Sequence, residues 1–513
     1  MMRKCCQMRK DMKCVCVICI SLSMFAVFLL SYMTSYELQT KTHMRRVILG
    51  GLGEFNSRGN TREENSIQIV EVVDTSGKKY RLDSFLDSSQ EDSVELHFGS
   101  KNKVVTSATT DVQTTHAQTT TPHGWIQKNC TGIQQTSELL QTKTFQFLAN
   151  YKNPCWHEPL RQVKVYSRNR FSEFSRYSKL ALNKLEEEWA KRISNNPYPR
   201  RLRCLPYFFI AGQPKCGSTD LYQKLTSHPD VVTPPIKEPH WWGKNRYGWR
   251  LNYTTAIPLT DYIDLFDRAA LMIEHVVNPL VPVEDGAEPF HQVITGDASV
   301  STLWDSDDWW RLDENCGRKE PLYTNADYIH HFLPNAKIIV ILRDPTERLY
   351  SDYLYFQKSR KSAEDFHLEV TKAINGFEAC LGKYTQRSCI YNRTVANLSK
   401  VRLRIGLYYE FIKEWLKVYP LDQMLIIRLD DYARDTRLTL QRVFNFLGLR
   451  KLKRDEEHIF QKPVANKRRL KDKNIGKMFR DTNRILDNFY RPFNEKLAEL
   501  LDDTNFLWTY DSI

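Results

Sequence analysis

The residues of this chain best suited to chemistry lie in a short loop between an apolar run and a small-residue segment. Tyr207 to Ala211 is apolar and aromatic and predicts a buried strand, and the next residues are Gly-Gln-Pro-Lys-Cys-Gly. A strand, a glycine-containing loop and a helix N-terminus bind phosphate together, because free backbone N–H groups and the helix dipole both face the anion. We therefore expect a phosphate site at Lys215, Cys216, Gly217, Ser218 and Thr219.

This loop departs from the pattern of nucleoside triphosphatases. Gly212 and Gly217 keep the expected glycine spacing, but Ser218 stands where those proteins place a lysine. The lysine of the loop is Lys215 instead. This displacement argues against ATP hydrolysis and indicates a different phosphate-bearing donor.

A second phosphate site is predicted further along the chain. Lys337 to Leu342 is a continuous β-branched run, typical of a buried parallel strand, and Arg343-Asp344-Pro345 ends it. A helix over 346–358 would bring Ser351 near Arg343, and this pair suits a phosphate group. Two phosphate sites on one α/β sheet indicate a nucleotide phosphorylated at both ends.

These motifs resemble those of the sulfotransferase superfamily. The resemblance rests on Pro-Lys-x-Gly-x-Thr at 214–219 and Arg-Asp-Pro-x-x-Arg-x-x-Ser at 343–351, and it extends from about Cys155 to the C-terminus. The string Ile-Lys-Glu-Pro-His-Trp-Trp at 236–242 is narrower, and it resembles the Golgi glycosaminoglycan sulfotransferases of chondroitin and dermatan sulfate. The resemblance implies 3′-phosphoadenosine 5′-phosphosulfate as the donor and the 6-hydroxyl of 4-sulfated N-acetylgalactosamine as the acceptor.

The resemblance also implies roles for the residues. Sulfuryl transfer depends mainly on positioning and charge stabilisation. Lys215 would neutralise the bridging oxygen of the donor, and Glu238 would accept the proton of the sugar hydroxyl. His240 is the alternative base. Arg343 and Ser351 would bind the 3′-phosphate, and the residues that follow Lys215 would bind the 5′-phosphosulfate.

Several further residues are assigned to the two substrates. The acceptor would contact Lys237, His240, Trp241 and Trp242, although core packing is the alternative for each tryptophan. Asp220 is counted with the donor loop, but many family members carry an aromatic or small residue there, which leaves its donor contact in doubt. The basic loop, residues 466–477, loosely resembles the family's cofactor-covering loop, and an exposed loop is the alternative.

The elements that must position these residues form an α/β fold. We expect a P-loop-like parallel sheet covered by helices on both faces, because strand and helix patterns alternate along the chain. The predicted strands are 207–211, 293–296, 337–342 and 424–429, and the predicted helices are 218–227, 346–358 and 436–447. A further helix is predicted over 179–193.

The N-terminal residues predict a membrane anchor. Val15 to Met33 is an uncharged apolar run of spanning length, and five basic residues against one acid precede it. The positive-inside rule then predicts a cytoplasmic tail (1–14), a signal-anchor (15–33), a luminal Ser/Thr-rich and largely disordered stem (34–150) and a luminal sulfotransferase domain (151–513). A cleaved signal peptide is the alternative, but no small-residue cleavage site follows. The expected location is the Golgi membrane, as a single-pass type II protein.

Charge and composition are consistent with a polyanionic partner. The formal net charge is +13, for which ordinary basic surface is the alternative explanation. A luminal location excludes nucleic acid and favours a sulfated glycosaminoglycan. The transfer needs no metal, and no metal-ligand set is visible in the sequence. The oligomeric state stays open, with a homodimer as one alternative.

The luminal location has consequences for cysteines and asparagines. Seven cysteines follow the anchor, so at least one has no intramolecular partner, and we expect Cys216 to be the free thiol. Cys380 and Cys389 enclose a short segment and are expected to form a disulfide in the oxidising lumen. Four N-x-S/T sequons predict N-glycosylation, at Asn129, Asn252, Asn392 and Asn397.

Other functions remain as alternatives. The same chemistry could act on another glycosaminoglycan or position, such as heparan sulfate, since the donor motifs do not distinguish acceptors. A sulfated-glycan binding protein without catalysis is a second alternative, and the presence of Lys215, Glu238, Arg343 and Ser351 argues against it. A nucleotide kinase would need a lysine directly after Gly217.

Overall fold

The computed structural model describes residues 138–508, except 161–163, 196–199, 249–254, 277–288, 316 and 359–360, together with two short strands further toward the N-terminus. The chain divides into two compact units, residues 1–95 and 96–513. In the first unit β1 (Val70–Val73) pairs antiparallel with β2 (Lys79–Leu82). The predicted tail, the predicted anchor and the sequons at Asn129 and Asn252 lie outside the described residues. Of the helices that are described, none is long and apolar enough to cross a membrane.

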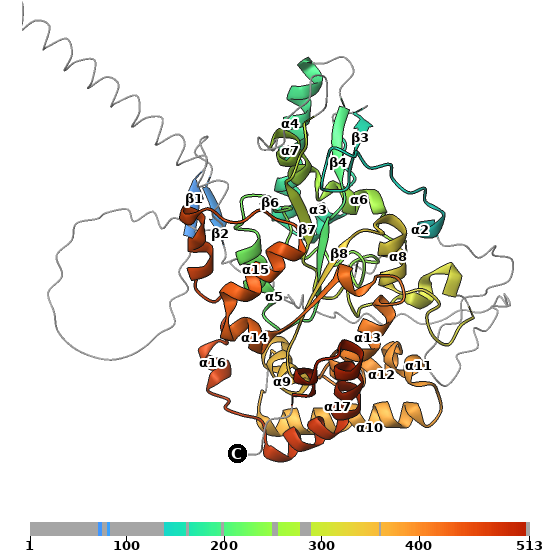
Figure 1. The fold of residues 1–513 in the computed structure, drawn as a ribbon. Coiled ribbons are helices and arrows are strands. Elements are labelled where there is room, and N and C mark those ends of the chain that lie inside the picture. Colours follow the sequence, from blue (N-terminus) through green and yellow to red (C-terminus); the bar gives the residue numbers. More distant parts are fainter. Residues whose placement is uncertain are drawn as a thin grey trace, which may run out of the picture. The chain divides into compact units, whose positions relative to one another are not determined.

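A parallel sheet of five strands forms the centre of the second unit (Figure 1). The strand order is β6-β7-β5-β8-β9, and every pairing is parallel. This sheet confirms the predicted α/β fold. The strands are β5 (Phe208–Gly212), β6 (Val231–Val232), β7 (Ile294–Asp297), β8 (Lys337–Leu342) and β9 (Met424–Arg428).

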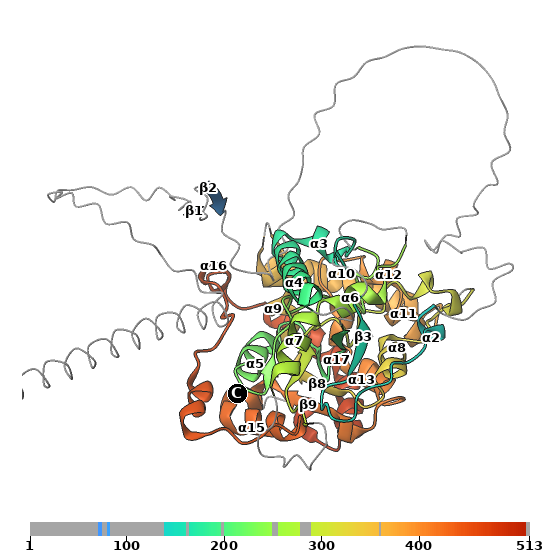
Figure 2. The same ribbon diagram turned by 90° about the horizontal axis from the view of Figure 1, so that it is seen from above.

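Strands β5 and β8 at the centre of the sheet are apolar, apart from Lys337 at the start of β8, because both faces of the sheet are covered. Successive side chains of β5 point to opposite faces, so Phe209 packs into one core and Phe208 into the other. Helices α5 (Ser218–Leu225) and α15 (Thr436–Phe446) contribute to the core around Phe208. Figures 1 and 2 show helices on both faces of the sheet. The core around Phe209 receives α8 (Asn325–Phe332), α9 (Pro345–Phe356), α13 (Tyr408–Trp415) and α17 (Arg480–Leu501).

An antiparallel hairpin precedes the central sheet in the chain. It pairs β3 (Cys155–Pro159) with β4 (Arg200–Cys204), and a disulfide joins Cys155 to Cys204. Arg203 of β4 is buried, and its Nη1 lies 2.7 Å from Asp264 Oδ1 and 3.1 Å from Asp267 Oδ2. Within the same segment α4 (Arg176–Asn195) confirms the helix predicted over 179–193.

Residues just before the hairpin also pack on the folded unit. The ring of Phe145 stacks on Trp156 at a centroid distance of 4.1 Å, and His331 Nε2 lies 3.0 Å from the carbonyl oxygen of Thr142. The folded unit therefore includes part of the segment that the sequence analysis assigns to the stem. Packing, rather than composition, sets this boundary.

The remaining helices surround the core. The α-helices are α2 (Glu138–Gln141), α3 (Phe171–Phe174), α6 (Leu259–Asp264), α7 (Asp267–His275), α10 (Ala363–Leu381), α11 (Gln386–Ile390), α12 (Arg393–Ala396), α14 (Leu429–Arg434) and α16 (Leu470–Lys473). The 3-10 helices are η1 (Trp309–Arg311), η2 (Asp313–Asn315), η3 (Leu403–Gly406), η4 (Leu421–Gln423), η5 (Arg454–Gln461) and η6 (Thr504–Leu507). Cys380 and Cys389 form the predicted disulfide between α10 and α11.

Candidate active site

The loop predicted to bind phosphate joins β5 to α5. Gly217 is the N-cap of α5 with φ of 89°, and a Cβ on this residue would lie 2.8 Å from Leu429 Cδ1. Both observations require glycine here. Ser218 begins the helix and is buried, whereas Thr219 is half-buried. The strand, loop and helix predicted from the sequence are therefore present in this order.

Lys215 occupies the turn of this loop with a left-handed φ of 68°. Its Nζ lies 3.4 Å from the ring centroid of Tyr355, which comes from α9. The same helix carries the buried carboxylate of Asp352. Burial tends to raise the pKa of Asp352, but Arg402, Arg348 and Lys215 outweigh burial and lower this pKa. The side chain of Lys215 therefore extends from the phosphate loop to α9, next to the ionised carboxylate of Asp352.

Among the cysteines that the structure describes, Cys216 is the free thiol, as the sequence analysis predicts, and it is buried. Burial raises the pKa of this thiol to about 12, so it stays protonated near neutral pH. Its Sγ lies 3.7 Å from the carbonyl oxygen of Pro214, inside the loop. Any donor contact from Cys216 must therefore come from its backbone.

Arg343 follows β8, the strand next to β5, so both predicted phosphate sites lie at the carboxyl edge of one sheet. Its Nη2 lies 2.9 Å from Glu347 Oε2, and a quarter of its side chain remains exposed. Asp344 caps α9 by accepting a hydrogen bond from the Thr346 N–H at 2.8 Å. Ser351 is half-buried about two turns further along α9.

Arg348 of the same helix has a structural role. Its side chain is fully buried, donates to the carbonyl oxygen of Arg402 at 3.0 Å, and lies 3.7 Å from Asp352. The second arginine of the motif therefore supports α9 from inside the core, and Arg343 is the arginine that remains partly exposed at the sheet edge.

The second group of candidate residues follows β6. The Glu238 carboxylate forms an ion pair with the Lys237 ammonium, and His240 Nε2 lies 3.4 Å from Glu238 Oε2. Ser301 Oγ lies 2.8 Å from His240 Nδ1, and the His240 backbone N–H donates to Ser299 Oγ at 2.9 Å. Both serines follow β7, so this loop fixes the imidazole beside the carboxylate.

The local charges favour the ionised form of Glu238. Burial alone would raise the pKa of this carboxyl, but Lys237 and His240 together hold the pKa below its ordinary value. About a fifth of the Glu238 side chain is exposed. The arrangement offers a carboxylate that is ionised at neutral pH and able to accept a proton.

Helix α5 connects the two groups of candidate residues. Its first turn completes the phosphate loop, and Tyr222, one turn later, lies 5.7 Å from Lys237 Nζ when measured to the ring centroid. Glu238 contributes to the raised pKa of Tyr222, whose largest cause is burial, with Asp297 also contributing. The Lys237–Glu238 pair therefore lies beside the helix that begins at the phosphate loop.

The two tryptophans belong to the core, which corrects the prediction that they bind the acceptor. Trp241 is fully buried and stacks on Tyr262 at a centroid distance of 5.1 Å, while its Nε1 donates to the Ile257 carbonyl at 3.0 Å. Trp242 is also buried and meets Tyr262 edge-on. Neither ring is available to stack on a sugar, because both side chains are buried in the core beside Tyr262 of α6.

Asp220 is likewise occupied by protein contacts. Its carboxylate is buried, and Lys224 Nζ lies 2.5 Å from Asp220 Oδ2. Tyr432 donates to Asp220 Oδ2 at 2.6 Å, and the Ala465 N–H donates to Oδ1 at 2.7 Å. The side chain is therefore turned toward the protein, which resolves the doubt about its donor contact in favour of a structural role.

The structure adds residues that sequence reasoning missed. Tyr355 contacts Lys215, and Tyr222 contacts Lys237, but nothing in the sequence distinguishes these tyrosines from core residues. Ser299 was more accessible to prediction. It lies two residues after the end of β7, a position typical of ligand-binding residues in parallel sheets.

The two sequons within the described residues differ in environment. Asn392 is 7% exposed, and its Oδ1 accepts hydrogen bonds from the N–H groups of Thr394 and Val395 as the N-cap of α12. Asn397 is exposed at the other end of the same helix. Of these two asparagines, Asn397 is the one whose side chain is exposed at the surface.

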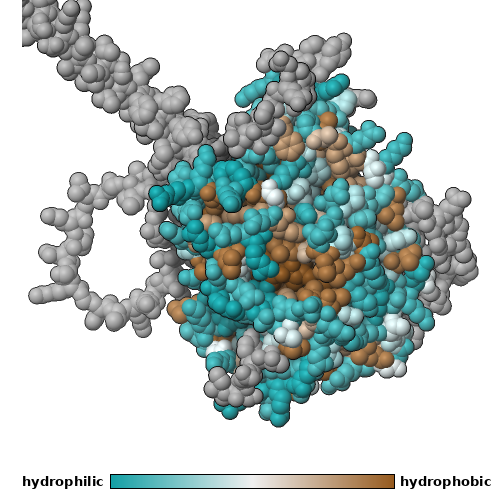
Figure 3. Space-filling model, in the orientation of Figure 1, coloured by the Kyte–Doolittle hydropathy of each residue, from teal (hydrophilic) through white to brown (hydrophobic). Residues whose placement is uncertain are grey.

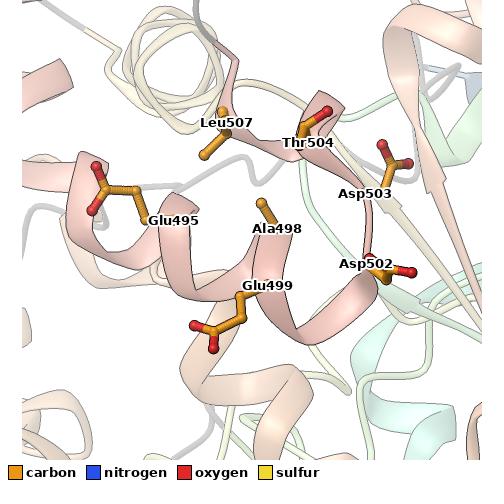
Figure 4. Close-up of a pocket in the computed structure, with 7 residues that line it drawn as sticks. All are labelled: Glu495, Ala498, Glu499, Asp502, Asp503, Thr504 and Leu507. Atoms are coloured by element: carbon orange, nitrogen blue, oxygen red, sulfur yellow. The ribbon is translucent and has the colours of Figure 1, made fainter.

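A surface hollow between α17 and η6 does not coincide with these groups (Figure 4). None of the candidate residues lines this hollow. Its lining consists of Ala498, Thr504, Leu507 and four carboxylates, those of Glu495, Glu499, Asp502 and Asp503. An acidic hollow disfavours anionic ligands.

The face in Figure 3 is mostly hydrophilic with an apolar area near its centre. Within the part of the chain that is described, no cluster of three or more side chains is suited to a metal ion.

The fold is that of an α/β protein whose two candidate phosphate loops follow adjacent parallel strands. Residues 206–453 match the model of the sulfotransferase family. Human carbohydrate sulfotransferase 15 is 43% identical over 370 residues, which cover 71% of this chain and 66% of the relative. The protein of the same name from Nototodarus sloanii is 42% identical over 142 residues, 28% of this chain and 89% of that protein. The chain belongs to the sulfotransferase family.

A more distant relative has a different acceptor in its name. Mouse heparan sulfate glucosamine 3-O-sulfotransferase 3B1 is 28% identical over 180 residues, which cover 32% of this chain and 42% of that protein. The chain matches just under two thirds of the length of the human relative. The strands and loops that carry the candidate residues lie within residues 206–453, the part that matches the family model.

Proposed function

We propose that this protein transfers a sulfuryl group from 3′-phosphoadenosine 5′-phosphosulfate to the 6-hydroxyl of 4-sulfated N-acetylgalactosamine in chondroitin or dermatan sulfate. One observation carries the proposal: α5 begins at the phosphate loop with Lys215 and packs beside the ionised Lys237–Glu238 pair. A cation for the leaving group and a base for the acceptor therefore lie beside the same helix, the cation in the loop before it and the base next to its Tyr222. The identity to carbohydrate sulfotransferase 15 supports the choice of acceptor.

The proposed reaction is an in-line displacement. Glu238 accepts the proton as the sugar oxygen forms its bond to sulfur. The bond between sulfur and the bridging oxygen breaks, and its electrons pass to the 5′-phosphate of the leaving 3′-phosphoadenosine 5′-phosphate. The Lys215 ammonium neutralises this developing charge. Arg343 at the neighbouring strand end binds the 3′-phosphate, and His240, fixed by Ser301, holds the Glu238 carboxylate in place.

The test is an acceptor panel. The chain is incubated with radiolabelled donor and with chondroitin, dermatan and heparan sulfates, each in native and desulfated form, and the products are digested to disaccharides. Label at the 6-position of 4-sulfated N-acetylgalactosamine is expected. Label on heparan sulfate or at another position would contradict the acceptor and keep the chemistry. Donor binding without any transfer would instead indicate a glycan-binding protein.

Replacing Lys237 with methionine should move the acidic limb of the pH–rate profile to higher pH. In the wild type, Lys237 helps to hold the pKa of Glu238 below its ordinary value of 4.5, so kcat should not fall from protonation of Glu238 above that pH. Without the ammonium, burial is less opposed and raises this pKa, so protonation removes the base at a higher pH. The measurement is kcat at saturating substrates from about pH 4.5 to 8.

A lysine outside the site supplies the control for this experiment. Lys413→Met on α13 removes a positive charge of the same type, and its profile should match the wild type. If the Lys237→Met variant keeps the wild-type limb, Glu238 is not the group whose protonation limits the reaction.

We further propose that the protein is a single-pass type II protein of the Golgi membrane with its catalytic unit in the lumen. The disulfides Cys155–Cys204 and Cys380–Cys389 and the exposed Asn397 support this location. Asn397→Gln should remove one glycan, seen as a faster-migrating band that matches enzymatic deglycosylation. Asn392→Gln should keep the glycan number and lose about 1 kcal/mol of stability with its helix cap. A glycan lost from Asn392 and not Asn397 would contradict this assignment.

A further inference from the structure

Asp220 joins three separate parts of the protein through one buried carboxylate. Lys224 contacts it from the next turn of α5, Tyr432 donates to it from α14, and the backbone N–H of Ala465 donates from the segment that leads into the basic loop. Lys224 is itself 2% exposed, so the ion pair is removed from water. Of these three partners, Ala465 is the one that belongs to a chain segment outside the regular core.

The basic loop crosses α9 next to the phosphate loop. The Arg469 guanidinium lies 5.3 Å from the ring centroid of Tyr355, the same ring that Lys215 Nζ approaches at 3.4 Å. Arg469 Nη2 also donates to the Tyr355 carbonyl oxygen at 3.2 Å. Further along, Tyr350 donates to the Gly476 carbonyl at 3.1 Å. The loop and the catalytic lysine candidate thus share contacts on one helix.

Polar contacts supply most of the attachment of this segment. From residue 462 to residue 479 Asp472 is the one buried residue, and Ile475 and Met478 are the apolar side chains that pack, partly buried, against the core. A segment with few buried apolar contacts opens at low free-energy cost, so each remaining contact has a large effect on its position. The hydrogen bond from Ala465 to Asp220 is the contact nearest to the start of the basic loop.

We propose that Asp220 is a positioning residue that fixes the basic loop beside the donor site, so that donor affinity depends on a carboxylate that does not touch the donor. This inference rests on the proposed function, because it assumes that the donor binds at the loop after β5. This positioning role also explains why an acidic residue, Asp220, stands next to a loop proposed to bind an anionic donor. The negative charge is balanced by Lys224 and by two hydrogen-bond donors, and it is shielded from the donor by burial.

The test compares four forms of the protein: the wild type, the double variant Asp220→Ala with Lys224→Met, the rescue variant Asp220→Asn with Lys224→Met, and the control Asp435→Ala. The double variant removes the buried ion pair as a unit, so no unpaired ammonium remains to unfold the protein. The rescue variant keeps a carbonyl oxygen that can accept from the Ala465 N–H. Asp435→Ala removes an N-cap of α15, which accepts from the Leu438 N–H at 2.8 Å, without touching the loop.

Two readouts separate loop position from overall stability. The first is limited trypsin cleavage after Lys467, Arg468 and Arg469, measured without donor. The second is the donor KM and the kcat. For the double variant we expect loop cleavage and donor KM each to rise about tenfold or more, the scale of one lost hydrogen bond to a charged group, with kcat within about twofold. The rescue variant Asp220→Asn with Lys224→Met should recover most of both effects, because the amide oxygen can still accept from the Ala465 N–H, and Asp435→Ala should change neither.

The outcomes distinguish the inference from the proposed function. Wild-type cleavage rates in the double variant would overturn the role of Asp220, whether or not the protein transfers sulfate. Faster cleavage with an unchanged donor KM would also overturn it, because the loop would then be irrelevant to the donor. If the wild type shows no transfer at all, the dissociation constant of 3′-phosphoadenosine 5′-phosphate replaces KM. An unchanged dissociation constant would then contradict the inference.

Discussion

Replacing Lys215 with alanine is expected to lower kcat by about 10³-fold, because the ammonium is the group placed to neutralise the leaving phosphate oxygen. The side chain lies at the turn of the phosphate loop, 3.4 Å from the centroid of the Tyr355 ring, and it is only partly buried. Its loss leaves no cavity in the core. The measurement is single-turnover transfer with saturating donor, together with thermal unfolding of the same preparation.

A second variant at this position separates catalysis from folding. Lys215 has a left-handed φ of 68°, a conformation that costs a residue with a side chain about 1–2 kcal/mol and glycine almost nothing. Lys215→Gly should therefore unfold at a temperature no lower than that of Lys215→Ala while losing the same rate. Transfer at the wild-type rate in either variant would exclude Lys215 as the group that stabilises the leaving oxygen.

Replacing Glu238 with glutamine is expected to lower kcat by about 10²- to 10⁴-fold, the range for removal of a general base. The amide keeps the shape of the side chain and one of its two accepting oxygens, but it cannot accept a proton. Donor binding should be unchanged, since Glu238 faces Lys237 and His240 rather than the phosphate loop. The measurement is kcat, with the affinity for 3′-phosphoadenosine 5′-phosphate measured by calorimetry.

His240 provides the matched comparison, because it is the alternative base. Its Nδ1 lies 2.8 Å from Ser301 Oγ and its Nε2 lies 3.4 Å from Glu238 Oε2, so the imidazole is held by Ser301 and in turn positions the carboxylate. His240→Asn should therefore reduce kcat much less than Glu238→Gln does. The reverse order of effects would transfer the role of base to His240.

The central strands could be predicted closely from the sequence, and the physical reason is their burial on both faces. Continuous apolar runs predicted β5 and β8, and β8 begins and ends where expected. Strand β6 has two residues, too few for a pattern. Strand β4 reads Arg-Arg-Leu-Arg-Cys, which does not resemble a buried strand. Its Arg203 is buried because Asp264 and Asp267, far along the chain, balance its charge.

In the candidate site, too, features set by local sequence could be predicted and features set by distant partners could not. Residues whose role depends on local backbone geometry, such as Gly217 and Lys215, lie where their spacing predicts. Roles that depend on distant partners were not predictable. Two adjacent tryptophans beside a candidate base suggest a platform for sugars, and only Tyr262 from α6 shows that they are core residues. The contact from Ala465 to Asp220 spans 245 residues of sequence, so no local pattern reports it.

The bond between Cys155 and Cys204 bears on how this protein should be produced. It closes a segment of 49 residues, and β4 is followed after three residues by β5, the strand that carries the phosphate loop. A crosslink over this length contributes about 4 kcal/mol by restricting the unfolded chain. Bacterial cytoplasm keeps thiols reduced, so protein made there would lack this contribution. A secretory host or an oxidising periplasm is therefore the appropriate source of material for every assay described above.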